Sequence, residues 1–181
     1  MKPAVLALSG SIASGKSTLS RELAQSFQWS YVSFGDYVRS VARNQGLAES
    51  RESLQLIGTE LLQRDTGKFC RAVLAQAQWQ AGQPIIVDGI RHVEVLDCLR
   101  QIVAPIDLYL IFASVDEVTR SARLLERGTT SLEKHQKLEQ DSTEQQVKTD
   151  LVQKSDLIVS STQPLEILIQ QISNWLESQC S

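Results

Sequence analysis

One segment near the N-terminus has the residue types and the spacing of a phosphate-binding loop. It fits the pattern G-x-x-x-x-G-K-[ST] and consists of Gly10, Ser11, Ile12, Ala13, Ser14, Gly15, Lys16 and Ser17. The glycines let the backbone curl so that several N–H groups face one concavity, where a phosphate can bind. The Lys16 ammonium can reach the β- and γ-phosphates of a nucleoside triphosphate, and the Ser17 hydroxyl can bind Mg²⁺. The motif therefore predicts that ATP and Mg²⁺ bind along residues Gly10 to Thr18.

The residues on either side of this loop provide the context that the motif requires. Residues 4–8 form a continuous apolar run, which suits a strand buried on both faces of a sheet. After the loop, Leu19, Leu23 and Phe27 recur every four residues and mark one face of a helix. The N-terminus of that helix adds a positive dipole end beside the bound phosphates. A Gly/Ser turn that only caps a helix is the alternative interpretation.

A second polar element, Ser33–Arg39, follows the next apolar run at residues 31–34. It resembles the S-x-G-D-x-x-R element of adenylate kinase and related nucleoside monophosphate kinases, which are P-loop proteins. The resemblance implies that Arg39 binds the phosphate of an acceptor, and it makes Asp36 a further acceptor-binding and candidate catalytic residue. Without the resemblance, the same residues suit a helix start, with Asp36 as the N-terminal cap and Arg39 on a solvated face.

The third apolar run, residues 85–87, leads into the polar element Asp88–Arg91. P-loop proteins place an acidic residue at this point, where it holds the water shell of Mg²⁺ or orients the nucleophile. We therefore expect Asp88 to act in catalysis and, with Ser17, to bind Mg²⁺ through water. An ordinary turn residue at the end of a strand is the alternative for Asp88.

The same element carries a further resemblance to known kinases. In adenylate kinase the similar element reads D-G-F-P-R, which implies that Arg91 contacts the acceptor phosphate. Here the proline is missing and His92 follows, so that D-G-I-R also resembles a group of dephospho-coenzyme A kinase-like P-loop proteins. That group also has G-L after its G-D-x-x-R, matched here by Gly46-Leu47. We expect His92 itself to be a partly exposed residue at a helix start.

Three arginines further along the chain, Arg120, Arg123 and Arg127, share one face of a predicted helix. Like charges on one face repel, so the arrangement favours an anion between them. The segment resembles the R-x-x-x-R at the lid entrance of nucleotide kinases, which implies that Arg123 and Arg127 hold the transferring phosphoryl group. A solvated face partly neutralised by Glu126 is the alternative.

Apolar runs alternate with helical patterns along the whole chain. Strands are predicted at residues 4–8, 31–34, 85–87, 108–112 and 157–159. Helices are predicted at residues 19–27, 38–47, 54–62, 69–79, 93–99, 115–125 and 165–176. This alternation implies a parallel sheet covered on both faces. We therefore predict one α/β domain, residues 1–181, with the P-loop NTPase fold and a five-stranded parallel sheet flanked by helices.

Two segments of this domain are expected to cover the site. Residues 35–67 would form an acceptor-binding helical flap, and residues 128–146 would form a short lid. The stretch from Thr129 to Thr149 is polar with few apolar residues, so it is predicted to be the least core-like part of the chain. A solvated surface helix is the alternative interpretation of this stretch.

The composition of the 181 residues is that of an ordinary globular protein, with 42% hydrophobic and 22% charged residues. A formal net charge of -3 argues against a general nucleic-acid-binding surface. No apolar run approaches the roughly 18 residues of a membrane span. The three cysteines, Cys70, Cys98 and Cys180, lie far apart and predict reduced thiols rather than a disulfide framework or a zinc site. We therefore expect a cytoplasmic protein that is a monomer or a homodimer.

Three functions are compatible with these features. The first is ATP- and Mg²⁺-dependent phosphorylation of a small-molecule acceptor, a nucleoside or deoxynucleoside monophosphate. The phosphate of such an acceptor is already ionised, so the reaction needs no general base. The second is a dephospho-coenzyme A kinase-like reaction at a ribose hydroxyl, with Asp36 as the candidate base. The third is a regulatory nucleotide-binding ATPase without a small acceptor. Arginine binds phosphate bidentately, so the pair Arg39 and Arg91 favours the first function.

Overall fold

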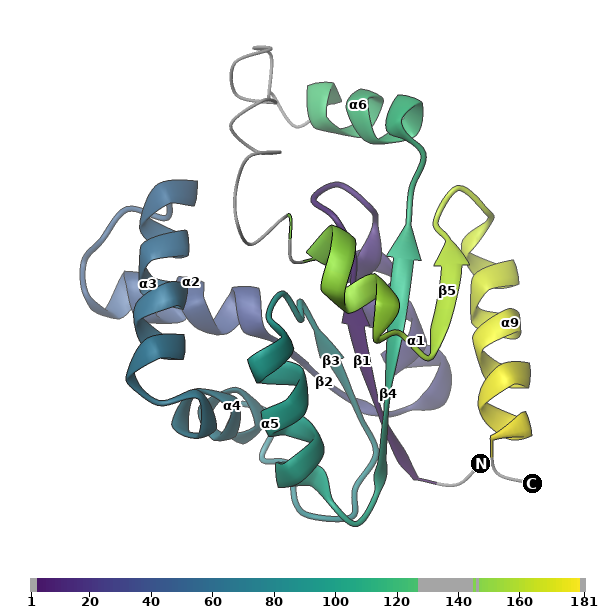
Figure 1. Ribbon diagram of the computed structural model, residues 1–181, viewed down its shortest axis with the longest axis horizontal. Helices are drawn as coiled ribbons and strands as arrows, with labels where there is room; N and C mark the ends of the chain where they lie inside the picture. Colours follow the sequence, from purple (N-terminus) through teal and green to yellow (C-terminus); the bar gives the residue numbers. More distant parts are fainter. Residues whose placement is uncertain (1–2, 127–144, 146, 180–181) are drawn as a thin grey trace.

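Five parallel strands form one sheet in the centre of the protein (Figure 1). The computed structural model describes residues 3–126, 145 and 147–179. The strands are β1 (Ala4–Ser9), β2 (Ser30–Ser33), β3 (Ile85–Asp88), β4 (Asp107–Ser114) and β5 (Leu157–Ser160). Their spatial order is β2-β3-β1-β4-β5. The predicted α/β class and five-stranded parallel sheet are therefore confirmed.

The central strand β1 is apolar because helices bury both faces of the sheet. Every residue of β1 is buried. Val5 and Ala7 contribute to one hydrophobic core, and Leu6 and Leu8 contribute to the other. This division follows from the alternation of side chains along a strand.

Helices α1 (Lys16–Phe27) and α9 (Leu165–Ser178) cover one face of the sheet (Figure 1). Leu19 and Leu23 of α1 share this core with residues of α9 such as Ile172. The apolar periodicity read from the sequence thus marks the buried faces of both helices.

The opposite face is covered by α4 (Thr66–Ala75), α5 (Val93–Val103) and a short π-helix, η1 (Val147–Leu151). The side chains of Val147 and Leu151 are fully buried. The stretch predicted to be least core-like therefore enters the core at Val147, because this residue anchors the chain before it returns to the sheet as β5.

Two further helices, α2 (Phe34–Asn44) and α3 (Arg51–Arg64), pack against each other beside the sheet (Figure 1). The sixth helix, α6 (Glu117–Glu126), follows β4 and stands above the carboxyl end of the sheet. Helix α2 begins four residues before the predicted start, because the Ser33 side chain caps it. Helix α4 ends earlier than predicted, and Gln78 beyond it has a left-handed φ of 51°.

The register of the sheet brings the carboxyl ends of three strands together. Asp88 of β3 pairs with Leu8 of β1 on one side and with Ser33 of β2 on the other. In open α/β sheets, ligands bind beyond the carboxyl ends of the strands, where neighbouring connections diverge. The segments that follow β1, β2 and β3 therefore meet where a ligand is expected.

The described cysteines, Cys70 on α4 and Cys98 on α5, are free thiols as predicted. Burial raises the pKa of Cys70 to about 12, and its neighbour Cys98 adds to the rise. Among the helices of the described ranges, none combines the length and the apolar character needed to cross a bilayer.

Candidate nucleotide and acceptor site

The predicted phosphate-binding loop connects β1 to α1 and is tightly curled. Ala13 and Gly15 have left-handed backbone conformations, with φ of 64° and 82°. The backbone N–H of Ser14 donates to the Ser11 carbonyl oxygen at 3.1 Å. Lys16 is only 8% exposed, and its Nζ donates to the same carbonyl oxygen at 3.3 Å. The loop thus holds the lysine in a fixed position beside its concavity.

Gly10, the first glycine of the motif, is required by the close approach of the loop to β4. A Cβ atom on Gly10 would lie 2.6 Å from the carbonyl oxygen of Ala113 and 2.7 Å from the hydroxyl oxygen of Ser14. Neither distance is tolerated by a real side chain, and the φ of 152° also disfavours one. The glycine therefore lets the loop pack directly on the sheet.

Asp88 lies at the end of β3 and is only 2% exposed. The Tyr31 hydroxyl donates a hydrogen bond to Asp88 Oδ2 at 3.2 Å. Burial, together with the negative charge of Asp88, raises the pKa of Tyr31 to about 12, so the hydroxyl stays a donor. Asp88 Oδ1 is buried and has no hydrogen-bond partner among the described residues. Because buried polar atoms are nearly always satisfied, this oxygen marks a place for a ligand.

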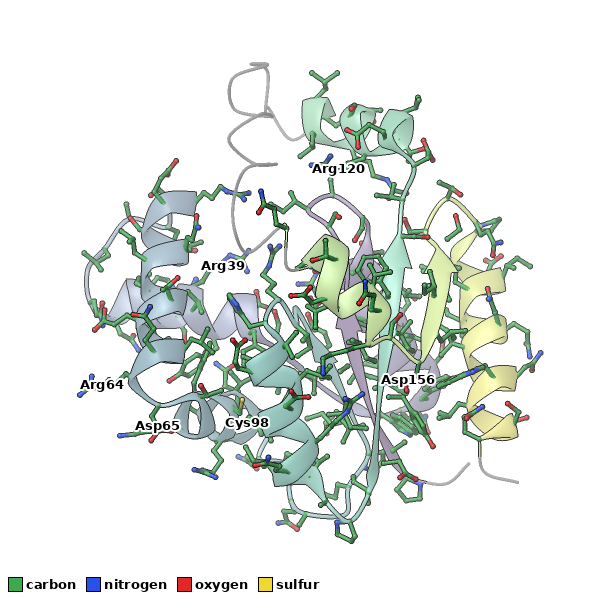
Figure 2. The ribbon with its side chains drawn as sticks, in the orientation of Figure 1. Arg39, Arg64, Asp65, Cys98, Arg120 and Asp156 are labelled. Atoms are coloured by element: carbon green, nitrogen blue, oxygen red, sulfur yellow. The ribbon has the colours of Figure 1, made fainter. Side chains whose placement is uncertain are left out.

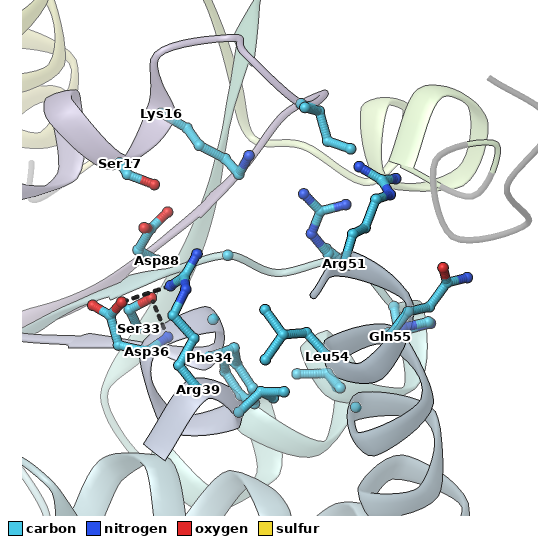
Figure 3. A pocket seen from close by; sticks show the side chains of 18 of the residues that line it. Lys16, Ser17, Ser33, Phe34, Asp36, Arg39, Arg51, Leu54, Gln55 and Asp88 are labelled. Atoms are coloured by element: carbon cyan, nitrogen blue, oxygen red, sulfur yellow. Dashed lines mark hydrogen bonds and ion pairs between the residues drawn. The ribbon is translucent and has the colours of Figure 1, made fainter. Parts of the chain in front are cut away.

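Ser17 and Asp88 have the chemistry of a Mg²⁺ site. Figure 3 shows the Ser17 hydroxyl and the Asp88 carboxylate pointing toward each other. Mg²⁺ takes oxygen ligands and is usually bound by one or two carboxylates together with phosphates and several waters. In the described part of the chain, no three or more His, Cys, Asp or Glu side chains gather into a metal cluster. The residues therefore fit an ion whose other ligands come from the nucleotide and water.

The start of α2 differs in one detail from the interpretation of Asp36 as a helix cap. Ser33 is the N-terminal cap, since its hydroxyl accepts a hydrogen bond from the Asp36 backbone N–H at 3.2 Å. The Asp36 carboxylate instead accepts a hydrogen bond from Arg39 Nη1 at 2.8 Å, and it lies 3.8 Å from Arg21 Nη2. A Cβ atom on Gly35 would come within 3.3 Å of Arg39 Nη1. The first turn of α2 therefore fixes the arginine through a carboxylate.

A cavity of about 670 Å³ opens between the phosphate-binding loop and helices α2 and α3 (Figure 3). Basic side chains in its wall come from Lys16, Arg21, Arg39, Arg51 and Arg91. Acidic side chains come from Asp36, Glu49 and Asp88. Apolar side chains come from Phe34, Val38, Leu54, Phe69 and Val95. The cavity is therefore suited to an anion that is attached to an apolar group.

The predicted acceptor residues Asp36, Arg39 and Arg91 line this cavity together with Lys16 and Ser17. They come from the segments that follow β1, β2 and β3, which the sheet register brings to one place. His92 lines the cavity as well. It is partly exposed and is the N-terminal cap of α5, as predicted.

Two arginines of the cavity wall, Arg21 and Arg51, were not singled out in the sequence. Arg21 lies on α1 four residues after Ser17, and its guanidinium carbon is 5.8 Å from the centre of the Tyr31 ring. The helical spacing from Ser17 is the signal that could have identified it. Arg51 is the first residue of α3 and belongs to no motif, so only the packing of α3 reveals it.

Arg123 lies outside the wall of this cavity. Its Nη2 donates to the Ser161 carbonyl oxygen at 2.9 Å, and its Nη1 lies 3.3 Å from both the Ala13 carbonyl oxygen and the Ser161 hydroxyl. These contacts attach α6 to the phosphate-binding loop and to the residue after β5. A role of Arg123 at the transferring phosphoryl group stays a prediction.

Arg120 and Arg123, two of the three arginines expected to share one face of α6, have different partners. Arg120 is buried and forms an ion pair with Glu117 at 2.9 Å, on the side of α6 that faces the body of the protein (Figure 2). Glu117 therefore neutralises this arginine, whereas the alternative interpretation of a solvated face assigned that part to Glu126. Arg127 and almost all of the predicted lid, residues 128–146, lie outside the described residues.

Comparisons with known proteins give matches along most of the chain. The AAA domain family matches residues 6–148. A UPF0200 protein of Pyrobaculum aerophilum is 30% identical over 176 residues, which are 95% of this chain and 96% of the relative. These two matches cover the phosphate-binding loop, helices α2 and α3, and the element around Asp88.

Two solved kinase structures share the fold over nearly the whole chain. The APS kinase of Mycobacterium tuberculosis, in complex with AMPPNP and APS, has a TM-score of 0.64 and 17% identity, and the match covers 97% of this chain and 98% of that one. Shikimate kinase from Aquifex aeolicus has a TM-score of 0.59 and 16% identity, with the same two coverages. The predicted P-loop NTPase fold is thus confirmed. This chain is a member of the AAA domain family and a relative of the UPF0200 proteins, and it has the nucleotide-binding fold of the P-loop kinases.

Proposed function

We propose that the protein is a Mg²⁺-dependent phosphotransferase that moves the γ-phosphoryl group of ATP to a nucleoside or deoxynucleoside monophosphate. The observation that carries the proposal is the cavity of about 670 Å³, which runs from Lys16 and Asp88 to Arg39 and Arg91. A regulatory ATPase without a small acceptor has no need of such a cavity beside its phosphate-binding loop.

The charges of the cavity support a phosphate-bearing acceptor. Arg39 and Arg91 come from two different elements and both line the wall. Arginine presents a planar fork of donors that matches a phosphate, and charge-assisted bonds of this kind are roughly twice as strong as neutral ones. Arg39 is already held by Asp36, so its guanidinium needs little reorganisation when an anion arrives.

The apolar part of the cavity suits the remainder of a nucleotide. Phe34 and Val38 of α2 and Leu54 of α3 line the cavity. A nucleobase is a flat and largely apolar ring with polar edges, so it gains free energy when such side chains cover its faces. The proposed acceptor would thus place its phosphate at the arginines and its base at the flap.

The reaction itself would need positioning more than covalent help from the protein. An oxygen of the acceptor phosphate attacks the γ-phosphorus, the bond to the bridging oxygen breaks, and ADP leaves with the electron pair. Lys16 would neutralise charge on the β- and γ-phosphates, and Ser17 with Asp88 would hold Mg²⁺, which supplies further charge neutralisation when bound.

A ribose hydroxyl acceptor, as in the dephospho-coenzyme A kinase-like reaction, is the second candidate function. The observation that favours it is the carboxylate of Asp36, which lines the acceptor cavity and could take the hydroxyl proton. The ion pair of Asp36 with Arg39 at 2.8 Å counts against it, because Oδ1 of the carboxylate already accepts a hydrogen bond from Arg39 Nη1.

Arg91→Ala tests the arginine pair. Loss of a charge-assisted bond to the acceptor phosphate should raise the acceptor KM roughly tenfold to 100-fold, while the KM of ATP changes little. Steady-state kinetics with a panel of nucleoside monophosphates measures both constants. Arg100→Ala is the matched control, because Arg100 lies on α5 away from the cavity lining and pairs with Asp97 and Asp156. Equal rises in both KM values for Arg91→Ala would contradict the assignment.

Asp36→Asn distinguishes the two acceptors. The amide oxygen of asparagine can still accept the hydrogen bond from Arg39, so the local structure should persist. With a phosphate acceptor we expect kcat to fall only slightly, since no base is lost. With a hydroxyl acceptor kcat should fall by roughly 10²–10⁴-fold. Turnover of dephospho-coenzyme A but of no nucleoside monophosphate, abolished in Asp36→Asn, would reject the proposal.

Tyr31→Phe tests how the carboxylate of Asp88 is oriented. The change removes the hydroxyl that donates to Asp88 Oδ2 and keeps the ring, so Asp88 should lose its fixed rotamer. Partners that orient a metal-binding group typically change metal affinity by about 10-fold or more. Electron paramagnetic resonance of free Mn²⁺ in the presence of AMPPNP measures this affinity without any turnover. Tyr109→Phe, whose ring packs on Trp175, is the control, and an unchanged Mn²⁺ affinity in Tyr31→Phe would refute the role.

A further inference from the structure

A glycine, Gly58, occupies the middle of helix α3 and lines the acceptor cavity. Glycine in a helix interior lowers stability relative to alanine, because it loses the most backbone freedom on folding and adds no side-chain packing. Its presence therefore needs a reason, either in the packing of the helix or in what the helix contacts.

The packing of α3 provides no such reason. Among the described residues, a Cβ atom on Gly58 would meet only Val38 Cγ2, at 3.9 Å, which is an ordinary van der Waals contact. Gly58 also has no left-handed backbone conformation, unlike Gly10 or Gly15 in the phosphate-binding loop. Alanine would therefore fit this position in the protein alone.

The neighbours of Gly58 along the cavity do have side chains. Leu54, Gln55 and Thr59 of the same helix line the wall, and Val38 lines it from α2. Gly58 is thus a gap in the side-chain wall of α3, at which a ligand can approach the helix backbone directly. Apolar groups flank the gap on the side of Leu54 and Val38, and polar groups lie beside it at Gln55 and Thr59.

We propose that Gly58 is a specificity-determining residue of the acceptor site, whose missing side chain admits the flat ring of the acceptor base against the backbone of α3. The inference rests on the proposed function, since it concerns the base of a nucleoside monophosphate. A methyl group at this position would occupy the space of the ring face. The glycine therefore lowers the stability of α3 and leaves room for the ring in the cavity.

Gly58→Ala separates this role from a structural one, because the two predict opposite changes. The melting temperature should rise by about 2–4 °C, as expected for a better helix former in a chain of this length. The KM of a nucleoside monophosphate should rise roughly tenfold or more, the usual effect of one misplaced methyl group in a pocket. The KM of ATP should not change, and Gly58→Leu should raise the acceptor KM further.

Ribose 5-phosphate, a probe with a phosphate but no base, tests which part of the acceptor meets Gly58. Its inhibition constant against the nucleoside monophosphate should be the same in the wild type and in Gly58→Ala. Gly67→Ala is the matched control, because Gly67 lies on α4 outside the cavity and a Cβ there would meet mainly the movable end of Arg71. It should leave the acceptor KM unchanged.

The outcomes distinguish this inference from the proposed function. If the wild type phosphorylates nucleoside monophosphates and Gly58→Ala leaves their KM unchanged, the role of Gly58 is refuted and the proposed function stands. An equal loss of affinity for ribose 5-phosphate would also refute it, because the effect would then not involve the base. If the wild type phosphorylates no nucleoside monophosphate, the proposed function fails and the inference fails with it.

Discussion

The pairing of β1 with β3, in which Leu8 lies opposite Asp88, is the constraint on which the site depends. Both strands are buried on both faces, so their register cannot slip without exposing an entire set of apolar side chains. The backbone N–H groups of Gly89 and Ile90 also donate to the Leu8 carbonyl oxygen, at 3.1 and 3.0 Å. The end of β3 is thereby fixed beside the phosphate-binding loop, and Asp88 can only lie near Ser17.

Without bound ligands, the charges of this site lower the stability of the folded protein. Asp88 keeps a buried oxygen without a partner in the described residues, and five basic side chains share one cavity. Repulsion and desolvation of this kind are tolerated where a ligand compensates for them, and a nucleotide with Mg²⁺ has the complementary charges. The Tyr31 hydroxyl and the carboxylate of Asp36 reduce this loss of stability, because each forms a hydrogen bond with one charged group of the site.

The sheet and the motif residues could be predicted from the sequence, because each of these has a local signal. The five strands are short apolar runs, and Lys16, Arg39 and Asp88 occupy fixed positions after three of them. The start of α2 at Phe34 and the buried Val147 were not predicted, since a serine cap and a single apolar residue in a polar stretch are weak signals. Arg51 and Tyr31 enter the site only through packing between distant elements, which no local pattern encodes.

The central claim is that this P-loop protein transfers a phosphoryl group to a small nucleotide, and one assay tests it most directly. Purified protein would be incubated with γ-labelled ATP, Mg²⁺ and each nucleoside or deoxynucleoside monophosphate, and the labelled products would be separated by chromatography. The account predicts that label appears in a nucleoside diphosphate with the wild type and not with Lys16→Ala, whose melting temperature should stay close to that of the wild type. Label that appears only in free phosphate, or full transfer by Lys16→Ala, would contradict it.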